Sequence, residues 1–417
     1  MATLHARDAP PACALTLFLL AGCGGGGASS ASASAAGVDP PEPSGPALAV
    51  RTSPPALLQV PPAPNVLPLS LGRGPRGTAF NAPFVSVTIC VPGTATCQTI
   101  DQVLLDTASS GLRIAASALQ GGMDLPPLRT ADGAPLSQCV AFASGAAWGS
   151  VRRADVRLAG EAASAIPVQV YERAAPAAPR RPGACATASD IAQVIDANGI
   201  LGVGPKRQDC GTGCESATPA AVYFTCAGGP CRPTPVARAS QVANPIAALG
   251  AHNNGLAILL PRVPPGGSSA VTGAVILGIG TQPNNALGAA RVFAPDAEGF
   301  LAVRYKGASY RSFLDTGTNS VRIPDADLPL CGEFYCPSQP GSLMATISGT
   351  AGAPQDVELT IESPDALSAD SIAAVIAGGA RTGRFVNWGL PFFFGRTVHL
   401  AIEGAETPAG LGPYWAF

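Results

Sequence analysis

The chain has 417 residues and a formal net charge of -2. It is long enough for about two to three domains and too nearly neutral for bulk binding to nucleic acid, so we expect no nucleic-acid partner. Only 12% of the residues are charged, while 49 Gly and 42 Pro predict many turns and few long exposed helices. An all-α or coiled-coil protein is excluded.

The first residues predict export and anchoring. Arg7 precedes an apolar run, residues 13–22, that is too short to span a bilayer and has the length of a signal-peptide core. Residues 20–23, Leu-Ala-Gly-Cys, resemble the lipobox of bacterial lipoproteins. We therefore predict a lipoprotein signal peptide over residues 1–23 with Cys23 as the lipid attachment site. The alternative is an ordinary secretory signal with a chance cysteine.

The residue after this cysteine is Gly24 rather than aspartate, which resembles the sorting pattern of outer-membrane lipoproteins. The expected location is the outer membrane, facing the periplasm or exposed on the surface. Residues 24–76 are rich in Gly, Ser and Ala and then in Pro, a composition that cannot bury a core. We predict a disordered tether over this range, although residues 47–76 also suit a pro-segment.

Ten cysteines remain after Cys13 and Cys23, and an even count in an exported protein predicts disulfides. Two pairs bracket short loops and should close locally. No metal site is expected, although the spacing of four of the cysteines leaves zinc as an alternative. The two local pairs are Cys90 with Cys97 and Cys331 with Cys336, and the four cysteines with zinc-like spacing are Cys210, Cys214, Cys226 and Cys231.

The pattern of apolar residues predicts a mainly β chain with few short helices. Residues 84–89 alternate with period two, and residues 99–105 and 271–277 form further apolar runs between turns. Helices are predicted near residues 190–197 and 370–377.

An internal repeat divides the chain. Residues 104–114 match residues 313–323 at a constant offset, 315 minus 106, of 209. The repeat predicts two lobes of similar fold, over residues 77–235 and 236–417. The two copies share five identical pairs, Leu105 and Leu314, Asp106 and Asp315, Thr107 and Thr316, Arg113 and Arg322, and Ile114 and Ile323.

In each copy an apolar strand runs into Asp-Thr and small residues, which predicts a carboxylate on a tight turn. If the copies face each other across a pseudo-twofold axis, Asp106 and Asp315 become neighbours. Two carboxylates about 3 Å apart share one proton, so the pair can act as base and acid toward a water molecule. Only His252 and His399 follow the signal peptide, and no GxSxG or HExxH motif occurs, which disfavours a Ser/His/Asp triad. The two repeated arginines, Arg113 among them, are expected to cap strands or face solvent.

Beyond these turns, the sequence resembles the bilobal pepsin-like aspartic peptidases. Residues 199–205 and 386–392 are similar to the segments that support the two aspartate loops, and residues 142–149 are similar to the flap hairpin. The chain also resembles a family of proteobacterial lipoproteins to which no activity is assigned. The pepsin-like resemblance implies a two-lobed β-barrel architecture of the acid-protease type.

The resemblance also implies roles for individual residues. Asp106 and Asp315 would be the catalytic pair, and Phe142 and Gly145 would belong to the flap. Ala108 departs from the family, which has glycine there, and Phe142 departs from the usual flap tyrosine. The supporting residues would be Thr107, Ser109, Thr316, Gly317 and Thr318.

Two functions of the cleft remain open from these residues, beside a plain structural lipoprotein in which the two aspartates lie far apart. The first is an aspartic endopeptidase, tethered to the membrane by its lipid, that hydrolyses polypeptide in a cleft between the lobes. The second is a non-catalytic cleft that binds a peptide or a partner in the cell envelope. Neither requires a metal or a cofactor, and we expect a monomer.

Overall fold

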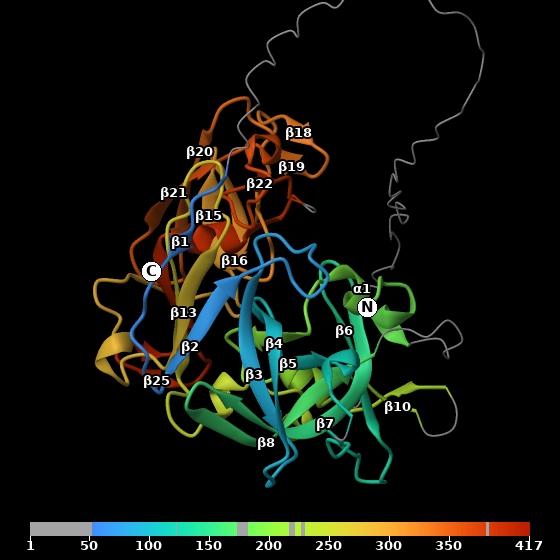
Figure 1. Ribbon diagram of the computed structural model, residues 1–417. Helices are drawn as coiled ribbons and strands as arrows, with labels where there is room; N and C mark the ends of the chain where they lie inside the picture. Colours follow the sequence, from blue (N-terminus) through green and yellow to red (C-terminus); the bar gives the residue numbers. More distant parts are fainter. Residues whose placement is uncertain (1–51, 122, 173–181, 217–221, 227–229, 381–382) are drawn as a thin grey trace, which may run out of the picture. The chain divides into compact units, whose positions relative to one another are not determined.

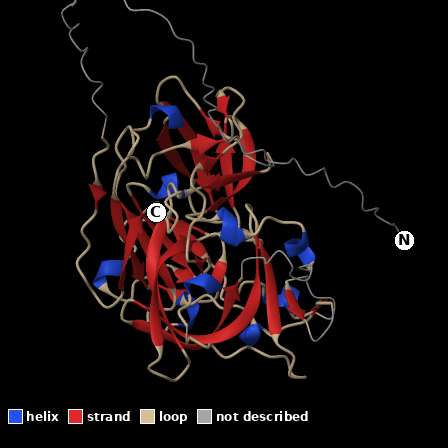
Figure 2. Cartoon of the chain, turned by 45° about the vertical axis from the view of Figure 1, so that its right-hand side comes forward, coloured by secondary structure: helices blue, strands red, loops and turns tan. Residues whose placement is uncertain are grey.

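The computed structural model describes residues 52–417 except 122, 173–181, 217–221, 227–229 and 381–382. The predicted signal peptide, its lipid attachment site Cys23 and residues 24–51 of the predicted tether lie outside the described residues. The described chain is mainly β with short helices, which confirms the predicted fold class (Figure 2). None of its helices has the length and apolar character needed to cross a bilayer.

The larger β sheet contains strands from the parts of the chain around both copies of the repeat. Within the described residues it has 16 strands, and a strand near the N-terminus lies between strands from the two halves of the chain (Figure 1). In order across the sheet, the strands are β11 (Arg232–Pro233), β10 (Tyr223–Thr225), β6 (Leu136–Ala141), β7 (Ala146–Leu158), β8 (Glu161–Tyr171), β5 (Ser110–Ala115), β9 (Gly199–Val203), β4 (Cys97–Asp106), β3 (Pro83–Cys90), β2 (Val66–Leu71), β13 (Val271–Leu277), β12 (Gly255–Leu260), β24 (Arg396–Ala401), β27 (Tyr414–Ala416) and β14 (Val292–Phe293), with β1 (Ala56–Leu57) paired to β13.

The second sheet has nine strands among the described residues, all between residues 301 and 388. Some strands of the second predicted lobe belong to the larger sheet, namely β12, β13, β14, β24 and β27. The sheets therefore do not divide the chain at residue 235, and this lobe boundary stays a prediction. The strands of the second sheet are β18 (Leu330–Cys331), β19 (Phe334–Tyr335), β22 (Ala377–Gly378), β17 (Val321–Arg322), β23 (Phe385–Trp388), β16 (Ala308–Leu314), β15 (Leu301–Tyr305), β20 (Gly341–Ser348) and β21 (Gln355–Ile361), and β25 (Glu406–Thr407) pairs separately with β26 (Gly410–Leu411).

The three strands predicted from the apolar pattern are confirmed as β3, β4 and β13. The helix predicted near residue 190 is reduced to a single turn, α1 (Ile191–Val194). The remaining helices of the described residues are 3₁₀ turns: η1 (Ala116–Ala118), η2 (Gly183–Ala186), η3 (Gly211–Cys214), η4 (Arg238–Ser240), η5 (Ile246–Ala248), η6 (Pro283–Asn285), η7 (Pro364–Ala366) and η8 (Leu390–Phe393).

The helix predicted over residues 370–377 is wrong. Ile372 donates its backbone N–H to the carbonyl of Ser268 at 2.8 Å, and Ala374 donates to Asn81 Oδ1 at 3.0 Å. These long-range partners hold the segment extended, and Ile372, Ala373 and Ala374 are all buried. A segment buried on every side looks apolar throughout, so its sequence pattern does not separate helix from strand.

The predicted tether is also wrong for its last part, because residues 66–71 form β2. This strand pairs with β13 and with β3, and Leu69 is only 1% exposed. Buried and exposed residues alternate along β2. The Pro-rich composition around this strand led to the prediction of a tether instead. Residues 66–71 are therefore part of the folded sheet.

The ten cysteines form five disulfides in the described chain. The two predicted local pairs, Cys90–Cys97 and Cys331–Cys336, are confirmed. The zinc alternative is wrong because all four of its sulfur atoms are consumed in disulfides. The remaining bridges are Cys139–Cys185, Cys210–Cys214 and Cys226–Cys231.

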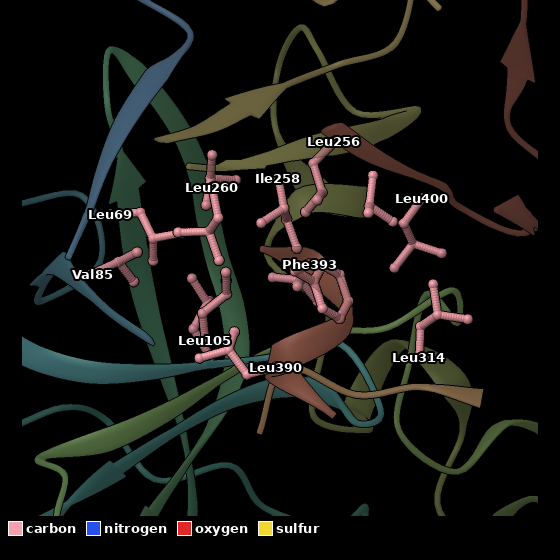
Figure 3. Close-up of a cluster of buried hydrophobic side chains, with 14 of the residues drawn as sticks. Leu69, Val85, Leu105, Leu256, Ile258, Leu260, Leu314, Leu390, Phe393 and Leu400 are labelled. Atoms are coloured by element: carbon pink, nitrogen blue, oxygen red, sulfur yellow. The ribbon is translucent and has the colours of Figure 1, made fainter. Parts of the chain in front are cut away.

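One apolar core connects the strands that carry the two repeats. Leu105 and Leu314, the residues directly before the two repeated aspartates, are fully buried in it (Figure 3). Leu390 and Phe393 of η8 pack in the same core. The aspartates therefore follow two strand ends that cannot move without disturbing packed side chains.

Candidate active site

Asp106 and Asp315 occupy equivalent places in the two sheets. Asp106 ends β4, which pairs in parallel with β9, and β9 pairs antiparallel with β5, the strand after the turn. Asp315 follows β16, which pairs in parallel with β23, and β23 pairs antiparallel with β17. The repeat in the sequence is thus a repeat of local structure, as the pepsin-like resemblance implies.

A glycine lies against each aspartate turn, at the end of the supporting strand. A Cβ atom at Gly202 would lie 2.8 Å from both the Gly111 carbonyl oxygen and Ser109 Oγ. A Cβ atom at Gly389 would lie 2.2 Å from the carbonyl oxygen of Ser320. Both supporting segments therefore need glycine so that the backbone can approach the turn.

The two turns are hydrogen-bonded to each other through their threonines. Thr107 Oγ1 donates to the Leu314 carbonyl at 2.9 Å, and Thr316 Oγ1 donates to the Leu105 carbonyl at 2.7 Å. Each hydroxyl also accepts the backbone N–H of the other threonine, at 3.0 and 3.2 Å. Thr107 and Thr316 are buried, and these hydrogen bonds hold the two turns in one fixed relation.

The carboxyl group of Asp106 is oriented by its own turn. The backbone N–H of Ala108 donates to Oδ1 at 2.9 Å, and Ser109 Oγ donates to Oδ2 at 2.5 Å. Ala108 is exposed and lines the cavity in front of the carboxyl group. Alanine in place of glycine therefore preserves the backbone hydrogen bond.

Asp315 has the matching contacts. The backbone N–H of Gly317 donates to Oδ1 at 2.9 Å, and Thr318 Oγ1 donates to Oδ2 at 2.7 Å. A Cβ atom at Gly317 would lie 3.0 Å from Asp106 Oδ1 and 3.2 Å from Asp315 Oδ1, so the two carboxyl groups flank one spot. Burial, and secondly the negative charge of Asp106, raise the pKa of Asp315 to about 7.

Both carboxyl groups open into one cavity of about 600 Å³. Antiparallel strands β6 and β7 form a hairpin above it, whose turn is closed by the Phe142 N–H donating to the Gly145 carbonyl at 2.7 Å. Phe142 lines the cavity, while Gly145 is buried and packs against the Ser189 carbonyl, where a Cβ would lie 2.5 Å away. The predicted flap thus faces the aspartates, and three further rings of the lining belong to Phe300, Phe313 and Phe385.

Of the two alternatives predicted for the repeated arginines, exposure to solvent is wrong for Arg113, whose Nη1 donates to the carbonyls of Ser110 and Gly111 at the start of β5. Its side chain is fully buried and forms an ion pair with Asp209 at 2.8 Å, in the wall of the cavity. Arg322 instead pairs with Glu333 at 2.6 Å and keeps 12% of its side chain exposed. Identical residues in the two copies therefore have different environments, which the repeat alone does not reveal.

The buried pair of Arg113 and Asp209 supports the flap. Gln138 of β6 donates its side-chain amide to Asp209, and the Tyr223 hydroxyl donates to the same carboxylate at 2.7 Å. On the other side, the Arg113 guanidinium lies 5.7 Å from the centre of the Phe142 ring. This network links the cavity wall to one flap strand and to the flap tip.

A second residue that sequence reasoning missed is Asn387 in β23. Its Nδ2 donates to Asp315 Oδ2 at 2.7 Å and to Thr318 Oγ1 at 3.1 Å. The signal available in the sequence was one polar residue in a supporting segment that is apolar in the first copy.

Comparisons with known proteins locate the chain among families. No curated protein matches the sequence. Among solved structures, the crystal structure of aspartic proteinase from Irpex lacteus is similar with a TM-score of 0.47 and 16% identity, over 84% of this chain and 96% of that chain. Residues 61–417 match the model of a family described as "Protein of unknown function (DUF3443)". The chain belongs to this family.

Proposed function

We propose that the protein is an aspartic endopeptidase that hydrolyses peptide bonds with water activated by Asp106 and Asp315. The observation that carries the proposal is the pair of carboxyl groups that flank one spot, each held by its own turn, at the base of a cavity covered by a flap. The raised pKa of Asp315 supports it, because a pair that shares one proton contains a base and an acid at once.

The proposed reaction begins with a water molecule between the carboxyl groups. The ionised aspartate takes a proton from this water as its oxygen attacks the peptide carbonyl carbon, and the protonated aspartate gives its proton to the carbonyl oxygen. The tetrahedral product then breaks its C–N bond as the aspartate that took the water's proton gives it to the leaving nitrogen, and the other aspartate takes a proton from a hydroxyl of the product. A carboxylic acid and an amine leave, and the pair again holds one proton.

The cavity favours an extended polypeptide as substrate. It is open enough to admit a chain segment, and its lining combines apolar rings with the two carboxyl groups. The fixed relation of the turns through Thr107 and Thr316 supplies the preorganisation that such chemistry requires.

Cleavage of an unfolded protein by the purified chain, from acidic to neutral pH, tests the proposal. We expect turnover that falls by about 10²–10⁴-fold in Asp106→Asn and in Asp315→Asn, because each loses one proton-transfer group. Asp101→Asn, an exposed change on the same strand as Asp106, is the matched control and should keep full turnover. Absence of turnover in a well-folded wild-type sample would refute the proposal.

The second candidate is a non-catalytic cleft that binds a peptide or an envelope partner. The methyl group of Ala108 on the cavity side and the missing hydroxyl of Phe142 favour it, since both lie where substrate would contact the carboxyl groups. Tight peptide binding that survives Asp106→Asn, without any turnover, is the outcome that would support this candidate.

For its location, we propose a monomer anchored to the outer membrane by lipid on Cys23. The lipobox-like residues 20–23 and the following Gly24 support this. Metabolic labelling with a fatty acid should mark the wild-type chain and leave Cys23→Ser unlabelled. Label on Cys23→Ser, or none on the wild type, would contradict the anchor.

A further inference from the structure

The two aspartates differ in one contact. Oδ2 of Asp315 accepts hydrogen bonds from Thr318 Oγ1 and from Asn387 Nδ2, both at 2.7 Å. Oδ2 of Asp106 accepts only the hydroxyl of Ser109 from the part of the chain that the structure describes. The additional donor is therefore an asymmetry within an otherwise repeated arrangement.

The strand registers identify what replaces this donor in the first copy. Asn387 of β23 is opposite Phe313 of β16, two residues before Asp315. Ile200 of β9 is opposite Leu104 of β4, two residues before Asp106. Ile200 therefore occupies the place of Asn387, and it is buried. The local fold accepts an aliphatic side chain there, so the sheet does not require an amide.

Stability does not explain the amide either. Asn387 Oδ1 is buried and has no hydrogen-bond partner among the described residues. A buried polar atom without a partner costs about 1–3 kcal/mol. The side chain instead makes two hydrogen bonds, from Nδ2 to Asp315 and to Thr318. We therefore expect its role to lie in its contact with the carboxyl group of Asp315.

A hydrogen-bond donor at a carboxylate favours the ionised form. We propose that Asn387 is a positioning residue that orients the carboxyl group of Asp315 and stabilises its ionised form, and so sets the upper pH at which the pair keeps its shared proton. This inference rests on the proposed function. Burial and the charge of Asp106 raise the pKa of Asp315, and Thr318 and Asn387 oppose that rise.

Other charged groups surround the pair and form a constant background. Asp106 faces Asp315 from β4, and the ion pair of Arg113 with Asp209 lies in the cavity wall. The rest of that lining includes Lys206 and Glu298, and Arg322, with its partner Glu333, is opposite Asn387 in β17. Asparagine and the residue that replaces it at position 387 are both uncharged, so the substitution leaves all of these charges in place.

The test compares the wild type with Asn387→Leu, which has nearly the same shape, and with Asn387→Ile, the residue of the other copy. In both variants the alkaline limb of the kcat/KM profile should move up by about one pH unit, since one unit equals 1.36 kcal/mol and a hydrogen bond to a charged group contributes about that much. Ile200→Val is the matched control and should leave the limb in place. An alkaline limb that stays or moves down would overturn the inference.

A second measurement does not depend on turnover. In Asn387→Leu, folded Asp315 keeps its proton to higher pH than in the wild type. As the pH rises, the free energy of unfolding of the wild type stops falling near pH 7, whereas that of the variant continues to fall above pH 7. The difference in unfolding free energy between wild type and Asn387→Leu should therefore grow above pH 7, and should be independent of pH in an Asp315→Asn background. A difference that is flat with Asp315 present would overturn the inference, whereas absence of wild-type turnover alone would refute only the proposed function.

Discussion

Ala108 and Gly317 are equivalent residues of the two turns, yet they are not interchangeable. Both donate a backbone N–H to the aspartate two residues earlier, at 2.9 Å. At Gly317, the space where a side chain would begin is already bounded by one oxygen of each carboxyl group. Glycine at residue 317 leaves the spot between the carboxyl groups free for a water molecule. The methyl group of Ala108, in contrast, narrows the cavity in front of Asp106.

Gly317→Ala should therefore lower kcat by about 10²-fold, because its methyl group would displace carboxyl oxygens from a preorganised geometry. Its Cβ would lie 3.0 Å from Asp106 Oδ1 and 3.2 Å from Asp315 Oδ1. Steady-state kinetics on an unfolded protein substrate measures the effect. Ala108→Gly is the matched control and should keep or raise kcat. Equal activity of Gly317→Ala and wild type would show that the spot is not used by the reaction.

Strand β2 shows how an element outside the repeats supports the site. It lies between β3, which continues into the hairpin with β4 and Asp106, and β13 from the second half of the chain. Its apolar residues point into the core that also holds Leu105 and Leu314. A segment whose composition is typical of a linker is thus one of the connections between the two copies.

Leu69→Ala tests this role of β2. Leu69 is 1% exposed, so removing its side chain should lower the free energy of unfolding by about 2–5 kcal/mol. Leu57→Ala is the matched control, because Leu57 is 53% exposed and the change should stay within about 0.5 kcal/mol. Urea denaturation measures both. A small effect at Leu69 would mean that residues 66–71 are dispensable for the fold and return them to a tether or pro-segment.

At the scale of the whole molecule, the shifted pKa values of buried carboxyl groups make the free energy of unfolding depend on pH. Folded Asp315 has a pKa of about 7, against an ordinary value of 3.8. Between these values the folded state binds more protons than the unfolded state, so its stability falls as the pH rises. At Asp196 burial raises the pKa, but hydrogen bonds from Thr78 and Arg76 outweigh it and lower the pKa. That contribution is lost as the pH falls, so we expect maximal stability in mildly acidic solution.

The free energy of unfolding of the wild type should fall between pH 4 and pH 7 by up to about 1.4 kcal/mol per pH unit from Asp315. Asp315→Asn removes this proton and should flatten the fall. Urea denaturation at a series of pH values gives both curves, with Asp101→Asn as an exposed control that should follow the wild type. Parallel curves for wild type and Asp315→Asn would contradict a raised pKa in the folded chain.

Local signals in the sequence were sufficient for the mainly β class, for strands β3, β4 and β13, for the two local disulfides and for the identity of both aspartate turns. These features depend on neighbours along the chain: an alternation of apolar residues, a short loop between cysteines, or small residues after an Asp-Thr pair. A repeated motif adds a long-range expectation, namely that its two copies face each other, and the threonine hydrogen bonds have the geometry that this expectation requires.

The tertiary structure alone decided the rest. Whether residues 66–71 are linker or strand depends on β3 and β13, and whether residues 370–377 coil or extend depends on Ser268 and Asn81, all distant in the chain. The identical arginines diverge because only Arg113 has a buried carboxylate within reach, that of Asp209. Asn387 gains its role from a hydrogen bond that spans 72 residues. Burial, pairing and desolvation are properties of neighbours in space, and a single sequence specifies those neighbours only through the completed fold.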